Sequence, residues 1–433
     1  MTQTLLWRRG VAAVGMYGGA ALGFLATIVA ARELATKGEF ARYAIVMAAV
    51  GLLQLIFDIT AEEAAVKYGY RYRKAGDWGR FRRLFRVMLG VKAAGGALGA
   101  VAVVCAAALS HAIYGKSGLV VPMLVAALIP LLQAPEGMAA AMLLVRGRYD
   151  LRGAFLAVSM GLRLAAIAFG APHGVVTMLA AIVAAQGFAT GAILAAGLVS
   201  LGRFPRAAPT PLGADGGPLR RFVFHSTLGS ALVSLRTTLP TNIVGGIMPS
   251  RAVADFRTAQ APQTALASLS APARMILMSE QSRHVEAGRL DRVYAGIRRY
   301  MLGTGALMAV FVPLAWWGMP WFVRVTVHAK YLSAVDAARL ILLTGAIQIV
   351  WGWTRPFAVS IGRPGLRALT YVAELVVLVP AVLVLGHRWG ATGAAGGVLA
   401  GSVAFALLWS VLLVRLRGQP VESAARRSAE ALS

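Results

Sequence analysis

Long apolar blocks separated by short polar gaps run along almost the whole chain. Each block has about 20 residues, the length that crosses the hydrocarbon core of a bilayer as one α-helix. The pattern therefore predicts an all-α integral membrane protein with about 12 transmembrane helices. The predicted spans are 11–31, 41–64, 84–110, 118–145, 150–171, 174–201, 221–247, 252–280, 297–321, 334–358, 365–386 and 391–414.

The polar gaps alternate between strongly basic and weakly charged. The basic gaps are 67–83, 146–150, 203–221 and 283–299, together with the tail from Arg415 to Arg427. The gaps with few basic residues are 112–117, 172–173, 248–251 and 387–390. Because Lys and Arg are retained on the cytoplasmic side, this alternation predicts a multi-pass protein of the cytoplasmic (inner) membrane with both termini in the cytoplasm.

The segment 202–220 is a linker rich in Pro and Gly, and it divides the spans six and six. This division predicts two pseudo-symmetric six-helix lobes, 1–201 and 221–414, followed by a basic cytoplasmic tail, 415–433. A weak internal repeat supports the two lobes, because an aromatic residue lies one turn inside the second span of each: Tyr43 in the first and Phe256 in the other.

Composition agrees with a membrane protein, since 58% of the residues are hydrophobic and only 14% are charged. The net charge of +26 would suggest nucleic acid as the partner of a soluble chain. Here the Lys and Arg residues lie in short gaps between apolar blocks, and no aromatic-rich polar domain could read bases. Nucleic acid is therefore excluded as a partner.

Two stretches resemble the polysaccharide repeat-unit (O-antigen-type) flippases of the multidrug/oligosaccharidyl-lipid/polysaccharide exporter superfamily. They are "TIVAARELATKGEFARYAIVMAAVGLLQLIFDITAEEAAVKY" at 27–68 and "TNIVGGIMPSRAVADFRTAQ" at 241–260. The resemblance implies a V-shaped pair of six-helix lobes around a central cavity. It also implies alternating access acting on a polyprenyl-pyrophosphate-linked sugar.

The chain departs from two branches of this superfamily. It has no room for the two extra helices usual in flippases of lipid-linked peptidoglycan precursors. The first span, 11–31, also lacks the acidic residue that the multidrug branch often has there.

The sequence points to five basic residues within predicted spans, where a charge at the centre costs about 2.5–3.5 kcal/mol. They are Lys92, Arg163, Arg236, Arg257 and Arg274. Either they form structural ion pairs with buried acids, or they line a hydrated cavity that binds an anionic headgroup; Lys92 and Arg274 have snorkelling as a further alternative. Arginine suits the second role because its guanidinium binds phosphate through two parallel hydrogen bonds.

Arg236 and Arg257 are the best candidates for headgroup binding, because Pro240 and Pro262 follow them and should kink their helices. Backbone carbonyls freed by such kinks are tolerated at membrane depth where they line a water-filled cavity. Nearby, Asn242 and Gln260 either offer hydrogen bonds to sugars or join neighbouring helices.

Among the acids within spans, four are candidates for a function: Asp58, Glu62, Glu136 and Glu374. Asp58 and Glu62 are four residues apart, so they are expected to share one helix face. Glu136 lies between Pro135 and Gly137, which predicts a local break in its helix. Each acid either pairs with a buried arginine or lysine or carries a coupling ion, H⁺ or Na⁺.

The sequence has no phosphate-binding loop, no clustered metal ligands and no nucleophile with a neighbouring base, so we expect neither an enzyme nor a bound cofactor. The function it favours is a flippase for a lipid-linked polysaccharide repeat unit. Its expected partners are this glycan, the membrane lipids and other polysaccharide-assembly proteins. The alternatives are a multidrug-type secondary exporter and a non-transporting membrane scaffold in envelope synthesis.

Overall fold

A computed structural model describes residues 2–267, 281, 284, 289–354, 357–358, 361 and 364–417. In this part of the chain the regular structure is entirely helical, which confirms the predicted all-α fold. The chain forms two compact units, Met1–Gly246 and Ile247–Ser433, and each is described by itself. The helices of the first unit are α1 (Thr2–Glu33), α2 (Lys37–Phe57), α3 (Ala61–Ala75), α4 (Trp78–Ala108), α5 (Ser110–Tyr114), α6 (Val120–Ala126), α7 (Leu128–Val145), α8 (Tyr149–Gly170), α9 (Val175–Gly202) and α10 (Gly216–Ile247), with short 3₁₀ turns at Ala171–His173 and Gly213–Asp215.

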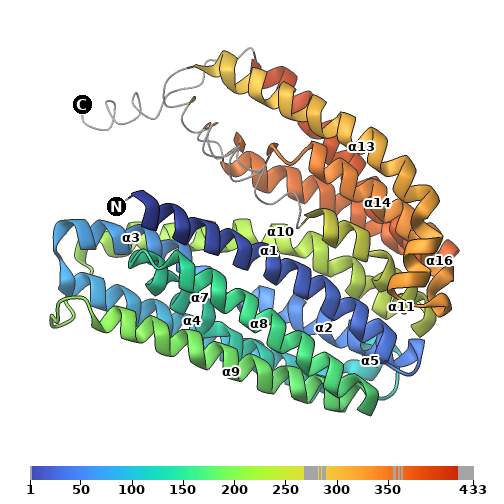
Figure 1. Cartoon of the computed structure of the whole chain (residues 1–433), viewed down its shortest axis with the longest axis horizontal. Helices are drawn as coiled ribbons and strands as arrows, with labels where there is room; N and C mark the ends of the chain where they lie inside the picture. Colours follow the sequence, from blue (N-terminus) through green and yellow to red (C-terminus); the bar gives the residue numbers. More distant parts are fainter. Residues whose placement is uncertain are drawn as a thin grey trace. The chain divides into compact units, whose positions relative to one another are not determined.

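The first unit is a bundle in which α1 packs along α8, and α9 packs along both α7 and α8 (Figure 1). The contact between α4 and α7 depends on small residues. A Cβ added at Gly96 would stand 2.5 Å from the Cβ of Ala134 and 2.8 Å from the carbonyl oxygen of Pro130. Only glycine therefore allows these two helices to approach so closely.

The second predicted span is interrupted at its inner end, where the sequence pattern predicted one continuous helix over 41–64. α2 ends at Phe57 and α3 begins at Ala61, and Asp58 between them has an extended backbone. Asp58 and Glu62 therefore do not share a helix face, which corrects the sequence prediction. The break is stabilised from outside the segment, because the Thr60 N–H donates to Thr227 Oγ1 at 2.9 Å and Lys92 binds the Asp58 carboxylate.

The predicted break at Glu136 is also wrong, because α7 continues through Pro135 to Val145. The interruption in this span lies earlier, at Ala127, between α6 and α7. A proline removes a single backbone hydrogen bond from a helix. We attribute the continuity of α7 to its close packing on α4, which holds the turn before Pro135 against Gly96.

α10 belongs to the first unit although it lies beyond the 202–220 linker. At one end, Tyr72 on α3 donates its hydroxyl to Asp215 at 3.0 Å, just before α10 begins. Near the other end, Asn242 donates to the Ala48 carbonyl of α2 at 2.9 Å and accepts from the Tyr114 hydroxyl at 3.1 Å. These contacts explain why the compact unit ends at Gly246 rather than at the linker; the pseudo-symmetry of the two predicted lobes remains a prediction.

The second unit contains α11 (Ser250–Ala259), a helical segment over 261–267, α13 (Leu290–Thr326), α14 (Val335–Val350) and α16 (Pro364–Arg417), with a 3₁₀ turn at Ala329–Ala334. α16 contains two helices that meet at Trp389 and Gly390, whose backbone is not helical. The two halves pack through glycine: a Cβ on Gly397 would stand 2.5 Å from the backbone nitrogen of Val382.

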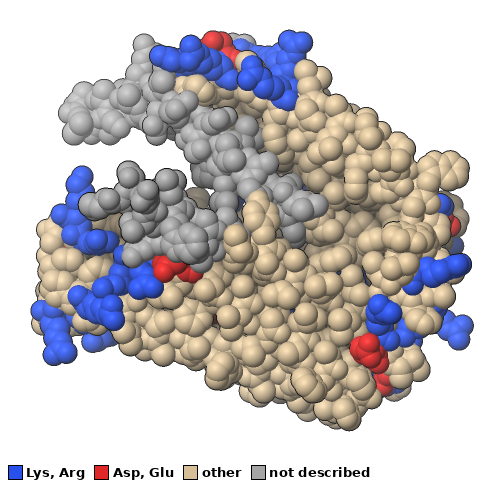
Figure 2. Space-filling model, viewed as in Figure 1, with Lys and Arg blue, Asp and Glu red and all other residues tan. Residues whose placement is uncertain are grey.

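Eight helices of the described part are long and apolar enough to cross a membrane. On the described face of the first unit seen in Figure 2, Lys and Arg gather at the ends of the helices and uncharged residues form a wide band between them. The protein is therefore an integral membrane protein with multiple helical spans. The total of 12 spans remains a prediction.

Candidate functional site

The first unit encloses a polar cavity of about 380 Å³ within its apolar helices. Five of its lining side chains carry ionisable groups, which is unusual at the depth of membrane-spanning segments. They are Asp58, Glu62, Lys92, Glu136 and Arg152. The structure thus brings together four of the residues singled out in the sequence: one predicted substrate ligand, Lys92, and three of the predicted ion-coupling acids.

Lys92 lies at the centre of an ion-pair cluster at the broken end of α2. Its ammonium binds the Asp58 carboxylate and lies 3.4 Å from a Glu62 oxygen. The lysine side chain is 5% exposed, whereas those of Asp58 and Glu62 are 39% and 35% exposed. For Lys92, the structure therefore shows ion pairing rather than snorkelling, and the carboxylates face the open part of the cavity.

Glycine makes room for this cluster. A Cβ on Gly137 would stand 3.3 Å from the Glu62 carboxyl carbon, and one on Gly95 would stand 2.5 Å from the Phe57 carbonyl oxygen. A side chain at either position would press on the acid or on the broken end of α2. A second, smaller space of about 30 Å³ adjoins Lys92 and has room for a water molecule.

A chain of amide hydrogen bonds crosses the same cavity and ends on Glu136. Gln54 on α2 donates to Gln133 on α7, which donates to Gln186 on α9, and Gln186 donates to the Glu136 carboxylate, each at 3.0 Å. Every amide in this chain donates towards the acid. The chain therefore joins three helices and places an amide N–H donor on the Glu136 carboxyl group.

The same order of polar groups recurs in the second unit. Gln263 donates to Gln348 on α14 at 3.0 Å, Gln348 donates to Ser402 at 3.4 Å, and Ser402 donates to the almost fully buried Glu374 at 3.4 Å. The first three members lie on the second, fourth and sixth spans of each predicted lobe. Each unit therefore holds a buried carboxyl group at the end of a polar chain.

Three further predicted site residues of the first unit, Arg163, Arg236 and Asn242, do not line its cavity. Arg236 is buried on α10 at 7% exposure. Asn242 on the same helix donates to Ala48 and Thr238 and accepts from Tyr114, so it joins α10 to its neighbours. α10 is one continuous helix from Gly216 to Ile247, and it includes Pro240, where the sequence predicts a kink.

Arg163 lies half-buried on α8, about one turn beyond Ser159 of the cavity wall. In the second unit, Arg257 donates to the Gln260 side chain at 2.7 Å. α11 ends at Ala259, so a break does lie close to Arg257 and before Pro262. Arg274 lies outside the described residues.

Sequence reasoning missed Arg152 and the three glutamines of the first unit. Arg152 lies near the start of α8, close to the basic gap at 146–150, and the sequence prediction did not select it. The glutamines had a usable signal. Gln54, Gln133 and Gln186 each interrupt an apolar span, and Gln133 is three residues before Glu136, on the same side of a helix.

The family described as polysaccharide biosynthesis protein matches residues 8–278, more than half of the chain. This protein belongs to the polysaccharide biosynthesis protein family. The match includes residues 8–246 of the first unit with its cavity, and it confirms the kind of family that the two quoted stretches resemble. No curated relative matches the chain.

Solved structures with this fold are transporters of the MOP superfamily and a lipid flippase. An inward-facing multidrug resistance MATE family transporter of that superfamily has a TM-score of 0.70 at 15% identity, with 95% of this chain and 98% of the other covered. The lipid II flippase MurJ, in an inward closed conformation, has a TM-score of 0.69 at 10% identity, with 92% and 87% covered. The Vibrio cholerae MATE transporter VcmN has a TM-score of 0.65 at 14% identity, with 97% and 99% covered. This family member therefore has the fold of these membrane transporters.

Proposed function

We propose that the protein is a flippase that moves a polyprenyl-pyrophosphate-linked oligosaccharide from the cytoplasmic to the outer leaflet by alternating access. The observation that carries the proposal is the charged and polar cavity inside the first unit of a polysaccharide biosynthesis family member. Sugar hydroxyls and phosphates are too strongly hydrated to enter hydrocarbon alone. A polar cavity at membrane depth lowers that barrier while the lipid tail stays in the bilayer.

The cavity offers both kinds of hydrogen-bonding partner that such a headgroup needs. Arg152 supplies positive charge for phosphate, and Lys92 adds a charge that its two carboxylate partners offset in the empty protein. The carboxylates of Asp58, Glu62 and Glu136 accept hydrogen bonds from sugar hydroxyls. We include Arg236, Arg257, Arg163, Arg274, Asn242 and Gln260 as further proposed headgroup ligands.

We also propose that transport is coupled to H⁺ or Na⁺. The proposed ion carriers are Glu136 and Glu374, at the ends of the two polar chains, and Asp58 and Glu62, in the lysine cluster. The proposed location is the cytoplasmic membrane with both termini inside, as the basic gaps predict. In this setting the protein would act beside other polysaccharide-assembly proteins.

A second candidate is the export of small organic cations. Three carboxyl groups but only two basic groups line the cavity of the first unit, so a cation would be attracted there. The likeness to MATE transporters extends over nearly the whole chain, although it concerns the fold alone. The two candidates differ in the sign of the cargo, which makes them separable by experiment.

Complementation tests the proposal. In a bacterial strain that lacks its own repeat-unit flippase, the protein should restore surface polysaccharide. Arg152→Gln should reduce that polysaccharide about 10-fold or more, because a lost charge-assisted hydrogen bond is worth about 1.5–3 kcal/mol. Arg206→Gln is the matched control, since it removes the same charge from the exposed linker and should change nothing. Resistance to cationic dyes without restored polysaccharide would contradict the flippase and favour the exporter.

Arg236 has its own test. Arg236→Ala should abolish transport and leave the melting temperature of the purified protein unchanged or raised, because burial of a cation costs free energy that the alanine variant avoids. Arg236→Lys should retain part of the activity, since an ammonium lacks the planar fork of the guanidinium. Lost transport together with a strongly lowered melting temperature would make Arg236 a structural residue.

A further inference from the structure

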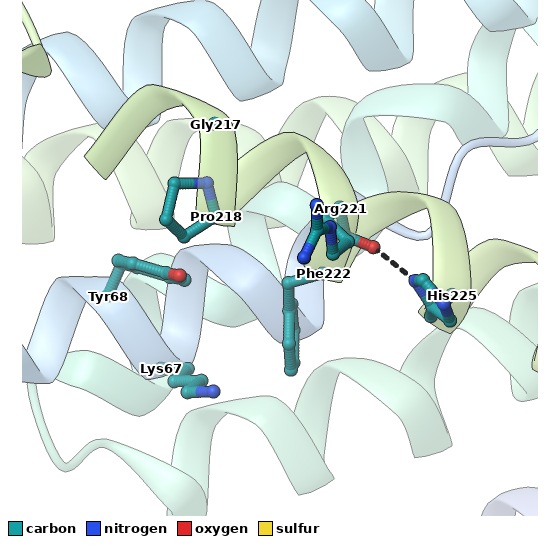
Figure 3. A pocket seen from close by; sticks show the side chains of 7 residues that line it. All are labelled: Lys67, Tyr68, Gly217, Pro218, Arg221, Phe222 and His225. Carbon is teal, nitrogen blue, oxygen red and sulfur yellow. Dashed lines mark hydrogen bonds between the residues drawn. The ribbon is translucent and has the colours of Figure 1, made fainter. Parts of the chain in front are cut away.

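A second cavity lies at the basic end of the first unit, between the middle of α3 and the start of α10. It has a volume of about 570 Å³ and is separate from the polar cavity, with which it shares no lining residue. Figure 3 shows Lys67 and Tyr68 on α3 facing the side chains of α10. The full lining, which we name the α3/α10 pocket, is Lys67, Tyr68, Gly217, Pro218, Arg221, Phe222 and His225.

The α3/α10 pocket is lined by basic and aromatic residues and by no acid. Neither Lys67 nor Arg221 has a carboxylate partner among the described residues. The Lys67 ammonium lies 4.3 Å from the centre of the Phe222 ring, and Tyr68 meets the same ring edge-on at 6.3 Å. Phe222 thus holds the ammonium at the pocket wall without neutralising it.

Two acids that are close in sequence to the pocket residues, Glu63 and Asp215, have other hydrogen-bond or ion-pair partners. Glu63, one turn before Lys67, accepts a hydrogen bond from Ser226 at 2.6 Å. Asp215 pairs with Arg71 at 3.0 Å and accepts from the Tyr72 hydroxyl. Burial and this hydrogen bond raise the pKa of Tyr72 to about 12, so it stays protonated and keeps donating to Asp215. No described carboxylate therefore forms an ion pair with Lys67 or Arg221, and both side chains are available to an anionic ligand.

The start of α10 adds to the positive potential, because the first backbone N–H groups of a helix point outward and carry partial positive charge. His225 uses one ring nitrogen, Nδ1, to donate to the Arg221 carbonyl at 2.7 Å, as the dashed line in Figure 3 shows. Beside the pocket the surface of α10 becomes apolar: Phe224 is 66% exposed and Leu228 is 46% exposed. A ligand with an anionic head and an apolar tail fits here, because its head would lie in the basic pocket and its tail on the apolar surface beside it.

We propose that the α3/α10 pocket binds the pyrophosphate of the lipid-linked glycan at the cytoplasmic surface before translocation. The proposal rests on the proposed flippase function and adds a docking site outside the polar cavity. A pyrophosphate diester carries two negative charges, which matches Lys67 and Arg221, whereas the phosphate of an ordinary anionic phospholipid carries one. Arg221 contributes a bidentate contact to phosphate oxygens and Lys67 a point charge. The tail then lies along Phe224 and Leu228.

Binding of farnesyl pyrophosphate to the purified full-length protein in detergent tests this proposal. Arg221→Gln should raise the Kd about 10-fold, the effect of losing one charge-assisted contact, and Lys67→Gln with Arg221→Gln should raise it about 100-fold. Arg220→Gln is the matched control: it removes the same charge one residue away, does not line the pocket, and should change the Kd less than about 2-fold. Melting temperatures confirm that each variant is folded, and Arg221→Lys, which keeps the charge, should bind with intermediate affinity.

Competition identifies the ligand. Short-chain phosphatidylglycerol, whose phosphodiester carries one negative charge, should displace the probe at least 10-fold more weakly than unlabelled farnesyl pyrophosphate. Equal displacement by phosphatidylglycerol would overturn the proposal and make the pocket a site for membrane lipids. Absence of binding to the unaltered protein, or equal weakening by Arg220→Gln and Arg221→Gln, would overturn it as well. If the pocket variants lose binding but the unaltered protein restores no polysaccharide, the flippase function fails while the pocket stands.

Discussion

Replacing both acids of the lysine cluster should destabilise the protein more than replacing the lysine itself. In Asp58→Asn with Glu62→Gln, the ammonium of Lys92, which is 5% exposed, loses both of its ion-pair partners. Removing the partner of a buried charge costs about 3–5 kcal/mol, and we expect about 3 kcal/mol because the cavity opens on one side of the cluster.

In Lys92→Met the groups left behind are carboxylates that are 39% and 35% exposed. Water from the cavity screens them, so we expect a loss of only about 1 kcal/mol. The triple variant, which combines all three substitutions, removes every charge of the cluster. Its stability should lie within about 1 kcal/mol of the unaltered protein, since neutral replacement of a whole buried ion pair is often harmless.

Thermal and chemical unfolding of the purified variants in one detergent measures these differences. Glu63→Gln is the control, because this acid is on the same turn of α3 but bonds to Ser226 instead of Lys92. The reasoning is refuted if Lys92→Met is at least as destabilising as the double acid variant. It is also refuted if the triple variant is no more stable than the double.

Three further outcomes are expected from the packing and the charge pattern. Gly397→Ala should lower stability by about 1–3 kcal/mol in thermal unfolding, because its Cβ would meet Val382, whereas Gly396→Ala, whose nearest neighbours are 3.8 Å away, should not. Asn242→Ala should destabilise the first unit by about 2 kcal/mol, because it leaves several buried groups without hydrogen bonds. Tyr114→Phe should cost less, and equal losses in the same unfolding assay would contradict this reasoning. Reporter fusions at the two termini should both report the cytoplasm, and opposite sides would disprove the predicted topology.

The fold could be predicted from the sequence because a membrane imposes one simple length and polarity rule on every span. That rule places α8 and α9 within about one residue of their observed ends. It fails where neighbouring helices decide the backbone. The break after α2 depends on Thr227 and Lys92, which are distant from it in sequence. The helix α7 continues through Pro135 because it packs closely on α4.

The site could be predicted in part. A charged residue inside an apolar span is visible in the sequence, and this signal found the acids and Lys92 of the cavity. Which charges meet depends on how each helix is rotated about its axis, and that is set by packing. For this reason the sequence does not predict the hydrogen bonds from Gln54 to Gln133 and from Gln133 to Gln186, although each of these residues is visible as a polar interruption of an apolar span.

The central claim, that the protein moves a lipid-linked glycan across a membrane, is tested most directly in proteoliposomes. A polyprenyl-pyrophosphate glycan with a fluorescent sugar is placed in the inner leaflet, and its arrival outside is followed by quenching with an impermeant reagent. The protein should speed this arrival well above that in protein-free liposomes, and Arg152→Gln should slow it about 10-fold. An arrival rate equal to that of protein-free liposomes, with folded protein present and an organic cation transported instead, would contradict the account.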